Sequence, residues 1–171
     1  PIAGTIDDQE IDEDTSLDVT ALATATDIDS DSGILSFSIA VNGNATVNQD
    51  TLMVTPTENY NGDIAVTVTV SDGELSDSTT FTLTVNPVND APTLDAISDD
   101  TVDEDNTYTI ELSGTDIDGD SLTFQASVDE GSVNVEGSTL SVSPNANYNG
   151  DILVSVLVSD GQASGSGSFT L

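Results

Sequence analysis

The sequence has 171 residues and contains no Lys, Arg, His, Cys or Trp, whereas Asp and Glu together number 32, so its formal net charge is −32. Because His, Cys and Lys are absent, Ser-His-Asp and Cys-His catalysis, Schiff-base chemistry and imidazole metal ligands are excluded. Without Lys or Arg it has nothing to neutralise phosphates, which excludes nucleic acid as a partner. Only paired carboxylates remain as catalytic groups, and we expect that the protein is not an enzyme.

Long apolar runs are also absent, since none approaches the roughly 18 residues that a membrane span requires. We therefore expect no membrane insertion in this segment. The sequence begins at Pro1 and stops at Leu171 within an expected strand, which we interpret as a piece of a longer protein. The absence of a targeting signal then says nothing about location.

The excess of carboxylates requires counter-cations if the chain folds. Carboxylate and amide oxygens are its only strong ligands, and these suit hard cations, chiefly Ca²⁺. Such charge is also typical of disordered chains. However, Leu, Ile, Val and Phe make up roughly a quarter of the residues and alternate with polar ones, which favours a folded protein. Weak calcium sites fill where calcium is millimolar, which favours an extracellular location.

The sequence repeats itself once, and this repeat sets the number of domains. Four motifs of the first half recur in the second: I/V-D-E-D, T-D-I-D, N-Y-N-G-D-I and S-D-G. The offsets between equivalent residues are nearly constant (104 − 13 = 91, 116 − 27 = 89, 148 − 60 = 88 and 160 − 72 = 88). We therefore expect two domains, residues 1–88 and 89–171, joined by the linker N-P-V-N-D-A-P at residues 86–92.

Within each repeat the hydrophobic residues recur with a period of two. Ile64, Val66, Val68 and Val70 alternate with small or polar residues, which is typical of a half-buried antiparallel strand. Pairs such as Asn61-Gly62 supply turns at short intervals. The predicted fold class is therefore all-β, with two tandem seven-stranded Greek-key β-sandwiches. In the first repeat we expect strands at residues 2–6, 16–25, 34–41, 44–48, 51–55, 64–71 and 78–86.

The acidic motifs can be assigned to the two ends of each sandwich. Successive strands run in opposite directions, so alternate loops lie at opposite ends. We call the end where the chain enters a domain its proximal end, and the end where it leaves its distal end. In the first repeat, Glu13 and the loop at residues 59–63 are expected at the distal end. Asp27, Asp29 and Asp72 are expected at the proximal end.

If the two repeats stack end to end, acidic groups from both converge on the linker. Ca²⁺ takes 6 to 8 oxygen ligands in flexible geometry, and carboxylates crowded there without it would repel one another. The expected inter-domain calcium ligands are Glu13, Asp63, Asn89, Asp90, Asp116, Asp118 and Asp160. Outer half-sites that face neighbouring repeats are expected at Asp27, Asp29 and Asp72 on one side, and at Glu104 and Asp151 on the other.

Four stretches resemble the calcium-binding motifs of cadherins. Ala25 to Ile39 is similar to the D-x-D segment and its following F-S-I strand, and Val70 to Gly73 is similar to the A-x-D-x-G loop. Val102 to Asn106 resembles the P-E-N segment, and Val88 to Pro92 resembles the D-x-N-D-N-A-P linker. Together they resemble the bacterial cadherin-like tandem repeats of very large surface and secreted proteins, in which V-N-D-A-P and N-Y-N-G-D recur.

The resemblance implies cadherin-like or Ig-like sandwiches, Ca²⁺ bound between repeats, and a location at the bacterial cell surface. Two departures stand out. The cadherin D-R-E motif is missing, with residues 58–63 in its place, and Asn86 and Val88 stand where cadherin linkers carry Asp and Asn. We therefore expect fewer ions per junction than in animal cadherins.

Three other interpretations of the motifs are weaker. Asp31 to Gly33 matches the aspartic-protease triplet by letters, but no apolar strand precedes it. An EF-hand is excluded because its sixth loop position is Ser32 or Ser121 instead of Gly. Tyr60 and Tyr148 would suit sugar stacking, but their identical placement in both repeats favours corner tyrosines that pack over the sheet edge.

The functional hypothesis is a calcium-stiffened segment of a large extracellular bacterial protein that acts as a stalk in adhesion. The expected partners are neighbouring repeats of the same chain and a homophilic partner or a polysaccharide. The alternative is a calcium-dependent polysaccharide-binding module of a secreted protein. The small number of aromatic residues, four Phe and three Tyr, supplies an aromatic sugar cleft poorly.

Overall fold

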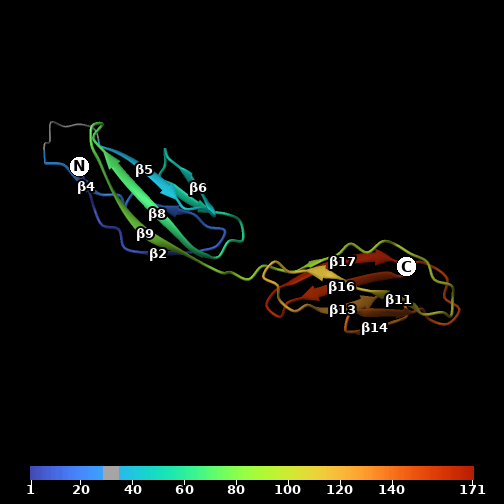
Figure 1. Ribbon diagram of the computed structural model, residues 1–171. Coiled ribbons are helices and arrows are strands. Elements are labelled where there is room, and N and C mark those ends of the chain that lie inside the picture. The colour runs from blue at the N-terminus through green and yellow to red at the C-terminus, as the bar shows by residue number, and fades with distance from the viewer. Residues whose placement is uncertain (29–34) are drawn as a thin grey trace. The chain divides into compact units, whose positions relative to one another are not determined.

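The computed structural model describes residues 1–28 and 35–171 (Figure 1). The chain divides into two compact units, Pro1–Val88, here unit 1, and Asn89–Leu171, here unit 2. The regular elements of the described residues are β-strands, which in each unit form two larger sheets and one two-stranded sheet. The predicted fold class, all-β with two tandem sandwiches, is therefore confirmed. Among the described residues, no helix has the length and apolar character to cross a membrane.

Unit 1 is a sandwich of a four-stranded and a three-stranded sheet. The orders are β2-β9-β8-β5 and β3-β7-β6, and β1 pairs with β4. Most neighbours in these sheets are not consecutive in the chain, so the chain crosses between the sheets as in a Greek key. The strands described are β1 (Ile2–Ala3), β2 (Gln9–Asp12), β3 (Leu17–Asp18), β4 (Ala25–Thr26), β5 (Ser36–Val41), β6 (Ala45–Asn48), β7 (Met53–Pro56), β8 (Gly62–Ser71) and β9 (Ser76–Asn86).

The core of unit 1 follows from the alternation in β8 and β9. Ile64 and Val66 of β8 are fully buried, as is Leu83 of β9, and Val54 of β7 faces them from the other sheet. Each such side chain contributes about 1.5–3 kcal/mol of transfer free energy on burial. Their outward neighbours are small or polar, and Thr67 of β8 and Thr80 of β9 share a hydrogen bond of 2.9 Å between hydroxyls.

Unit 2 repeats this plan with three sheets in the orders β13-β16-β17, β11-β15-β14 and β10-β12. Its core contains Leu140, Val142, Ile152, Val154 and Val156, all at most 2% exposed. The strands are β10 (Thr93–Leu94), β11 (Tyr108–Glu111), β12 (Gly114–Thr115), β13 (Thr123–Val128), β14 (Ser132–Glu136), β15 (Thr139–Ser143), β16 (Leu153–Ser159) and β17 (Ser164–Thr170).

The first two predicted strands differ from the structure, because the first is shorter and is followed by an unpredicted strand, β2, and the second is divided into β3 and β4. The predicted strand 2–6 ends at Ala3, and the chain then moves to the other sheet, where β2 pairs in parallel with β9. The predicted strand 16–25 is interrupted by a turn in which the Val19 carbonyl accepts hydrogen bonds from the N–H groups of Leu22 and Ala23. Alternation alone does not reveal this change of sheet.

The loops lie at the ends that strand alternation predicts. At the distal end of unit 1, the backbone N–H of Asn59 donates to Asp14 Oδ1 at 3.0 Å, which joins the loop after β2 to the loop before β8. The same contact recurs in unit 2, where the N–H of Asn147 donates to Asp105 Oδ1 at 2.9 Å. The repeated motifs therefore code for the same tertiary contacts in both units.

The N-Y-N-G-D motif forms a tyrosine corner in each unit, as predicted. The Tyr60 hydroxyl donates to the Asp63 carbonyl at 3.2 Å, and the Tyr148 hydroxyl donates to the Asp151 carbonyl at 3.1 Å. Both rings pack against the core of their unit. Gly150 has a φ of 154°, and a Cβ there would lie 2.9 Å from the Tyr148 hydroxyl oxygen, which explains the glycine.

Candidate metal centre

Five oxygen-bearing side chains gather at the proximal end of unit 2. Two belong to the start of the chain segment before β10, two follow β12, and one follows β16. Strand direction brings these three segments to the same end of the sandwich. We call this group the proximal cluster of unit 2, and its members are Asn89, Asp90, Asp116, Asp118 and Asp160.

Asp116 organises the loop that follows β12. Its Oδ1 accepts hydrogen bonds from the backbone N–H groups of Asp118 at 3.0 Å and Asp120 at 3.2 Å. Gly119, with a φ of 79°, allows the chain to turn within this loop. The second oxygen, Oδ2, is buried and has no hydrogen-bond partner. A buried carboxylate oxygen without a partner is costly, so this position calls for a cation.

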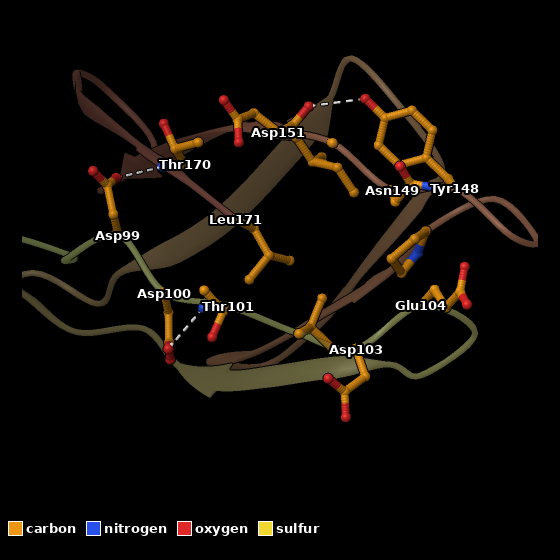
Figure 2. Close-up of a pocket in the computed structure, with 14 residues that line it drawn as sticks. Asp99, Asp100, Thr101, Asp103, Glu104, Tyr148, Asn149, Asp151, Thr170 and Leu171 are labelled. Carbon is orange, nitrogen blue, oxygen red and sulfur yellow. Dashed lines mark hydrogen bonds between the residues drawn. The ribbon is translucent and has the colours of Figure 1, made fainter.

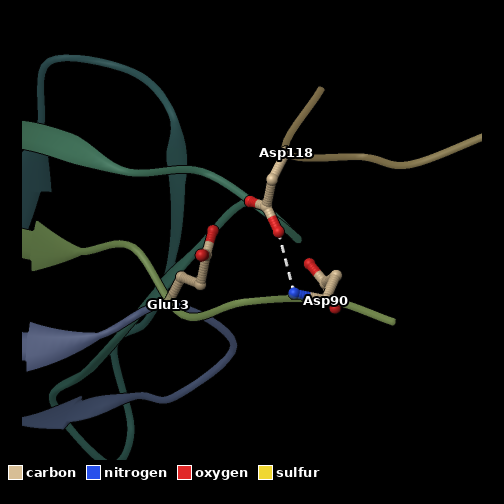
Figure 3. Close-up of side chains that lie close together, drawn as sticks. All are labelled: Glu13, Asp90 and Asp118. Atoms are coloured by element: carbon tan, nitrogen blue, oxygen red, sulfur yellow. Dashed lines mark hydrogen bonds between the residues drawn. The ribbon is translucent and has the colours of Figure 1, made fainter. Parts of the chain in front are cut away.

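Asp118 connects that loop to the start of unit 2. Its Oδ2 accepts a hydrogen bond of 2.8 Å from the backbone N–H of Asp90, which Figure 3 shows as a dashed line. The Asp90 and Asp118 carboxylates each have an oxygen within 4.8 Å of the other. Two like charges at this distance repel unless a cation lies between or beside them.

Asp160 ties the loop after β16 to Asn89. Its Oδ1 accepts from the backbone N–H groups of Gln162 and Ala163, both at 2.6 Å, and its Oδ2 accepts from the Asn89 side-chain amide at 2.9 Å. The Asn89 amide lowers the pKa of the Asp160 carboxyl below its ordinary value, and the N–H groups of Ala163 and Gln162 act in the same direction. Asp160 is therefore held in its charged form.

The chemistry of the proximal cluster suits a hard cation. Four of its five side chains are carboxylates, the fifth offers an amide oxygen, and the chain has no cationic side chain to neutralise them. Oxygen ligands of this kind, supplied by loops, are those that Ca²⁺ takes in proteins. Together with the buried Oδ2 of Asp116, this donor set fits calcium.

Glu13 and Asp63, the two predicted ligands from unit 1, have different surroundings. Glu13 is 4% exposed, and its Oε1 accepts a hydrogen bond of 2.5 Å from the N–H of Val88, the last residue of the unit. Its own N–H donates to the Asn86 carbonyl at 2.9 Å. Asp63 lies in β8, where its Oδ1 accepts from the Thr84 hydroxyl at 2.9 Å. The structure therefore fixes Glu13 to the linker, and Asp63 to a neighbouring strand.

The outer half-sites are described in part. At the proximal end of unit 1, Asp72 Oδ1 accepts from the N–H groups of Leu75 and Glu74 at 2.8 Å, which lowers the pKa of its carboxyl. Its Oδ2 lies 3.7 Å from the α-amino nitrogen of Pro1. Asp27 follows β4 at the same end, and the predicted ligand Asp29 lies outside the described residues.

At the distal end of unit 2, Glu104 and Asp151 are exposed and line a groove of about 680 Å³ (Figure 2). The counterpart of Glu104 in unit 1 is Glu13, which is buried.

The sequence profile of the bacterial Ig domain family matches residues 1–86 and residues 89–171. The chain belongs to this family. Each unit is thus one bacterial Ig domain, and the predicted resemblance to cadherin-like repeats is confirmed at the level of an Ig-like sandwich repeat. No curated protein matches the chain.

Solved structures with distant similarity include two cadherins and a glycoside hydrolase. Human protocadherin-24 has a TM-score of 0.47 and 13% identity over 86% of each chain. Drosophila N-cadherin has a TM-score of 0.39 and 13% identity over 99% of this chain and 47% of its own. An endo-fucoidan hydrolase of glycoside hydrolase family 107 has a TM-score of 0.36 and 18% identity over 99% of this chain, which spans 27% of the hydrolase chain. Similarity this distant says nothing about function.

The sequence motifs did not identify Gln162, which lies beside the proximal cluster of the second Ig domain. Gln162 donates from its side-chain amide to Asn89 Oδ1 at 2.7 Å, so it orients the amide that contacts Asp160. The first Ig domain carries Glu74 at the equivalent position, and this difference within the repeated S-D-G-x motif was the available signal. Gln162 therefore supports the proximal cluster from a neighbouring position.

Proposed function

We propose that this chain is a calcium-binding module of an extracellular bacterial surface protein, in which Ca²⁺ stiffens the connection between successive Ig domains and so supports adhesion. Membership of the bacterial Ig domain family supports an adhesion or surface module. The composition supports calcium, because folding of a chain with net charge −32 requires counter-cations that oxygen ligands can hold.

The observation that carries the proposal is the proximal cluster of unit 2. Its carboxylates come from two loops and from the first residues after Val88, so an ion there fixes the start of unit 2 to the loops of that unit. Asp116 would supply its buried Oδ2, and Asp118, Asp160, Asp90 and Asn89 the remaining oxygens. Calcium binding and order in the linker are thereby coupled.

Glu13 extends this coupling to unit 1 in the proposal. Its carboxylate accepts from the N–H of Val88, and the next residue along the chain is Asn89 of the proximal cluster. We infer that Glu13 joins the calcium ligands and that Asp63 of the same unit contributes a further carboxylate. The outer half-sites, Asp27, Asp29 and Asp72 and also Glu104 and Asp151, would serve neighbouring repeats in the same way.

Small-angle scattering with and without calcium tests the proposal. Calcium should narrow the distribution of inter-domain distances in the parent chain, because the ligands belong to both units and to the linker. Glu13→Gln should reduce this change, whereas Glu10→Gln, which removes an exposed charge from β2, should leave it as in the parent. If calorimetry shows calcium binding but the scattering profile does not change, the proposed stiffening of the linker by calcium is wrong.

The alternative, a calcium-dependent polysaccharide-binding module, has less support. In both copies of the N-Y-N-G-D motif the tyrosine ring packs against the core and its hydroxyl donates to a backbone carbonyl. The rings therefore do not form a stacking platform for sugars. Pull-down on insoluble polysaccharides, with calcium and with chelator, separates the two functions. Binding that requires calcium would favour the alternative, and the same pull-down with a second copy of the chain tests homophilic association.

A further inference from the structure

Strand β13 lies at one edge of the sheet β13-β16-β17 in unit 2 (Figure 1). Directly after β13, the N–H of Asp129 donates to the carbonyl of Leu153, the first residue of β16, at 3.3 Å. Main-chain groups alternate in direction along a strand, so those of Phe124, Ala126 and Val128 point away from β16. The outer edge of β13 therefore presents a row of backbone donors and acceptors.

Unit 1 closes the corresponding edge with a glutamine side chain. Its edge strand is β5, where the N–H of Ile39 donates to Gln49 Oε1 at 2.9 Å and the Ile39 carbonyl accepts from Gln49 Nε2 at 2.6 Å. The amide of Gln49 thus takes the place of a neighbouring strand. Ile39 corresponds to Ala126, because they lie opposite Val68 and Val156, which are separated by the repeat offset (156 − 68 = 88).

Unit 2 has a valine where unit 1 has this glutamine. Val133 of β14 corresponds to Val47 of β6, since each lies opposite the equivalent valine of the next strand. Two residues further on, Val135 takes the position of Gln49, lies opposite Leu140 and packs against the core. Edge strands are usually covered, interrupted or charged, but β13 is an unbroken, uncharged stretch, T-F-Q-A-S-V. Within unit 2, every residue of which is described, no side chain closes this edge at Ala126.

We propose that the open edge of β13 is a self-association surface, to which β13 of a second copy of the chain adds as an antiparallel strand. The register has Ala126 opposite Ala126 of the second copy, and Phe124 opposite Val128 on either side. All of these residues direct their main-chain groups outward, so each pair exchanges two backbone hydrogen bonds. The two three-stranded sheets then form one continuous sheet across a two-fold axis.

Charge favours a second copy as the occupant of this edge. Because the chain has no cationic side chain, two copies repel each other wherever their carboxylates meet, and they can associate only through uncharged surface. The proposed register places Asp129 of one copy opposite Thr123 of the other, so carboxylates do not face each other across the axis. A cationic partner would instead gain most at the acidic loops and nothing at β13.

The outer face of the same sheet is also free of charge beside this edge. A groove of about 550 Å³ lies there, and its outward-facing lining residues are Gln125, Ser127, Ser155, Leu157, Ser166 and Ser168. The approach of a second copy along β13 is therefore not opposed by carboxylates on this face. A contact limited to one pair of strands is small and weak, and it gains strength when several act together. The inference deepens the adhesion role proposed above and rests on it, although the contact itself requires no calcium.

Amide hydrogen exchange at increasing protein concentration tests this pairing. The full chain is measured in chelator and about 0.5 M NaCl, which screens the net charge, up to about 2 mM protein. Exchange at Phe124, Ala126 and Val128 should slow with concentration, by about tenfold once nine-tenths of the chains are paired. The amides of Gln125 and Ser127, which already face β16, should change much less. Exchange at Ala126 that does not depend on concentration would overturn the proposal, and so would equal slowing at all five amides.

A pair of variants distinguishes the edge from the outer face of the sheet. Ser127→Asp adds a carboxylate to β13 close to the two-fold axis and should raise the dimer dissociation constant by about tenfold or more in sedimentation equilibrium. Ser168→Asp adds the same charge to the same face, but on β17, and should leave the constant near that of the parent. Both serines are exposed, so neither change disturbs the core.

Equal weakening by both variants would mean that copies meet through the sheet face, which would contradict pairing at the edge. Chelator is present in all of these measurements. Failure of the β13 contact therefore does not bear on calcium binding at the proximal cluster, which the scattering experiment tests separately.

Discussion

At the scale of single residues, the proximal cluster of unit 2 depends on carboxylates that accept hydrogen bonds within their loops and also supply negative charge for a cation. Asp116 uses one oxygen to shape its loop and leaves the other buried without a partner. Asp160 uses one oxygen on backbone N–H groups and the other on Asn89. These hydrogen bonds shape the loops and at the same time bring several negative charges close together.

Asp118→Asn should weaken calcium binding without unfolding the chain. The Asn oxygen can still accept from the N–H of Asp90, but one negative charge is lost from the site. Since a charge pair near a protein surface is worth on the order of 1–4 kcal/mol, the dissociation constant should rise by about tenfold or more. Isothermal titration calorimetry measures this. Glu136→Gln, which removes an exposed charge of β14, should leave the constant unchanged; an equal effect of both variants would refute a localised site.

Asp160 should give unit 2 an acid-sensitive contribution to stability. Its folded pKa is below the unfolded value of about 3.9, so the contribution is present above about pH 4 and is lost as the pH falls through the folded pKa. In calcium-free denaturation, the difference in unfolding free energy between the parent and Asp160→Asn should shrink as the pH drops from about 5 to about 2. A difference that does not change with pH would contradict this assignment.

At the scale of elements, alternation in the sequence was enough to place the core strands. β8 and β9 occupy the ranges expected for them within a few residues, because strictly alternating β-branched residues leave one face to bury. The first strands could not be placed in this way. Their division between two sheets depends on pairing with β4 and β9, distant partners that a local pattern does not contain.

Leu140→Ala in β15 should lower the free energy of unfolding of unit 2 by about 2–5 kcal/mol, because this side chain is fully buried and its loss leaves a cavity. Leu157→Ala in β16 is the matched control, since that leucine lies on the outer face and is 38% exposed, and it should change stability little. Chemical denaturation of both variants, followed by probes in each unit, measures the difference. Equal destabilisation would mean that the sheet faces have been assigned wrongly.

The candidate site could be foreseen only in outline. The S-D-G and T-D-I-D motifs fixed which loops carry the acids, and strand direction assigned these loops to one end. The individual hydrogen bonds could not be predicted, such as the one that Gln162 donates to Asn89 or the one that Thr84 donates to Asp63. Each depends on side-chain geometry between segments more than twenty residues apart.

At the scale of the whole molecule, the dominant property is a charge of −32 without any cationic side chain. Self-repulsion of this size opposes the compact state and is relieved by screening or by bound cations. The two bacterial Ig domains therefore fold against a common electrostatic penalty. Specific binding of Ca²⁺ and general screening by Na⁺ should act on it differently.

Removal of calcium should lower the melting temperature at low salt, and NaCl at 0.15 M should restore only part of the loss. Free calcium at 100 times its dissociation constant should stabilise the folded chain by about 2.7 kcal/mol per site, whereas Na⁺ acts only through screening. Differential scanning calorimetry in calcium and in chelator, each at two salt concentrations, tests this. If NaCl of equal ionic strength replaced calcium fully, no specific site would be needed.

Nuclear magnetic resonance titration of the full chain with Ca²⁺ tests most directly whether the proximal cluster of unit 2 binds calcium. The largest shifts should occur at Asn89, Asp90 and Asp160 and in the loop at residues 116–120, and they should saturate together at one concentration. Small shifts spread evenly over the exposed carboxylates, without saturation at millimolar calcium, would contradict the account.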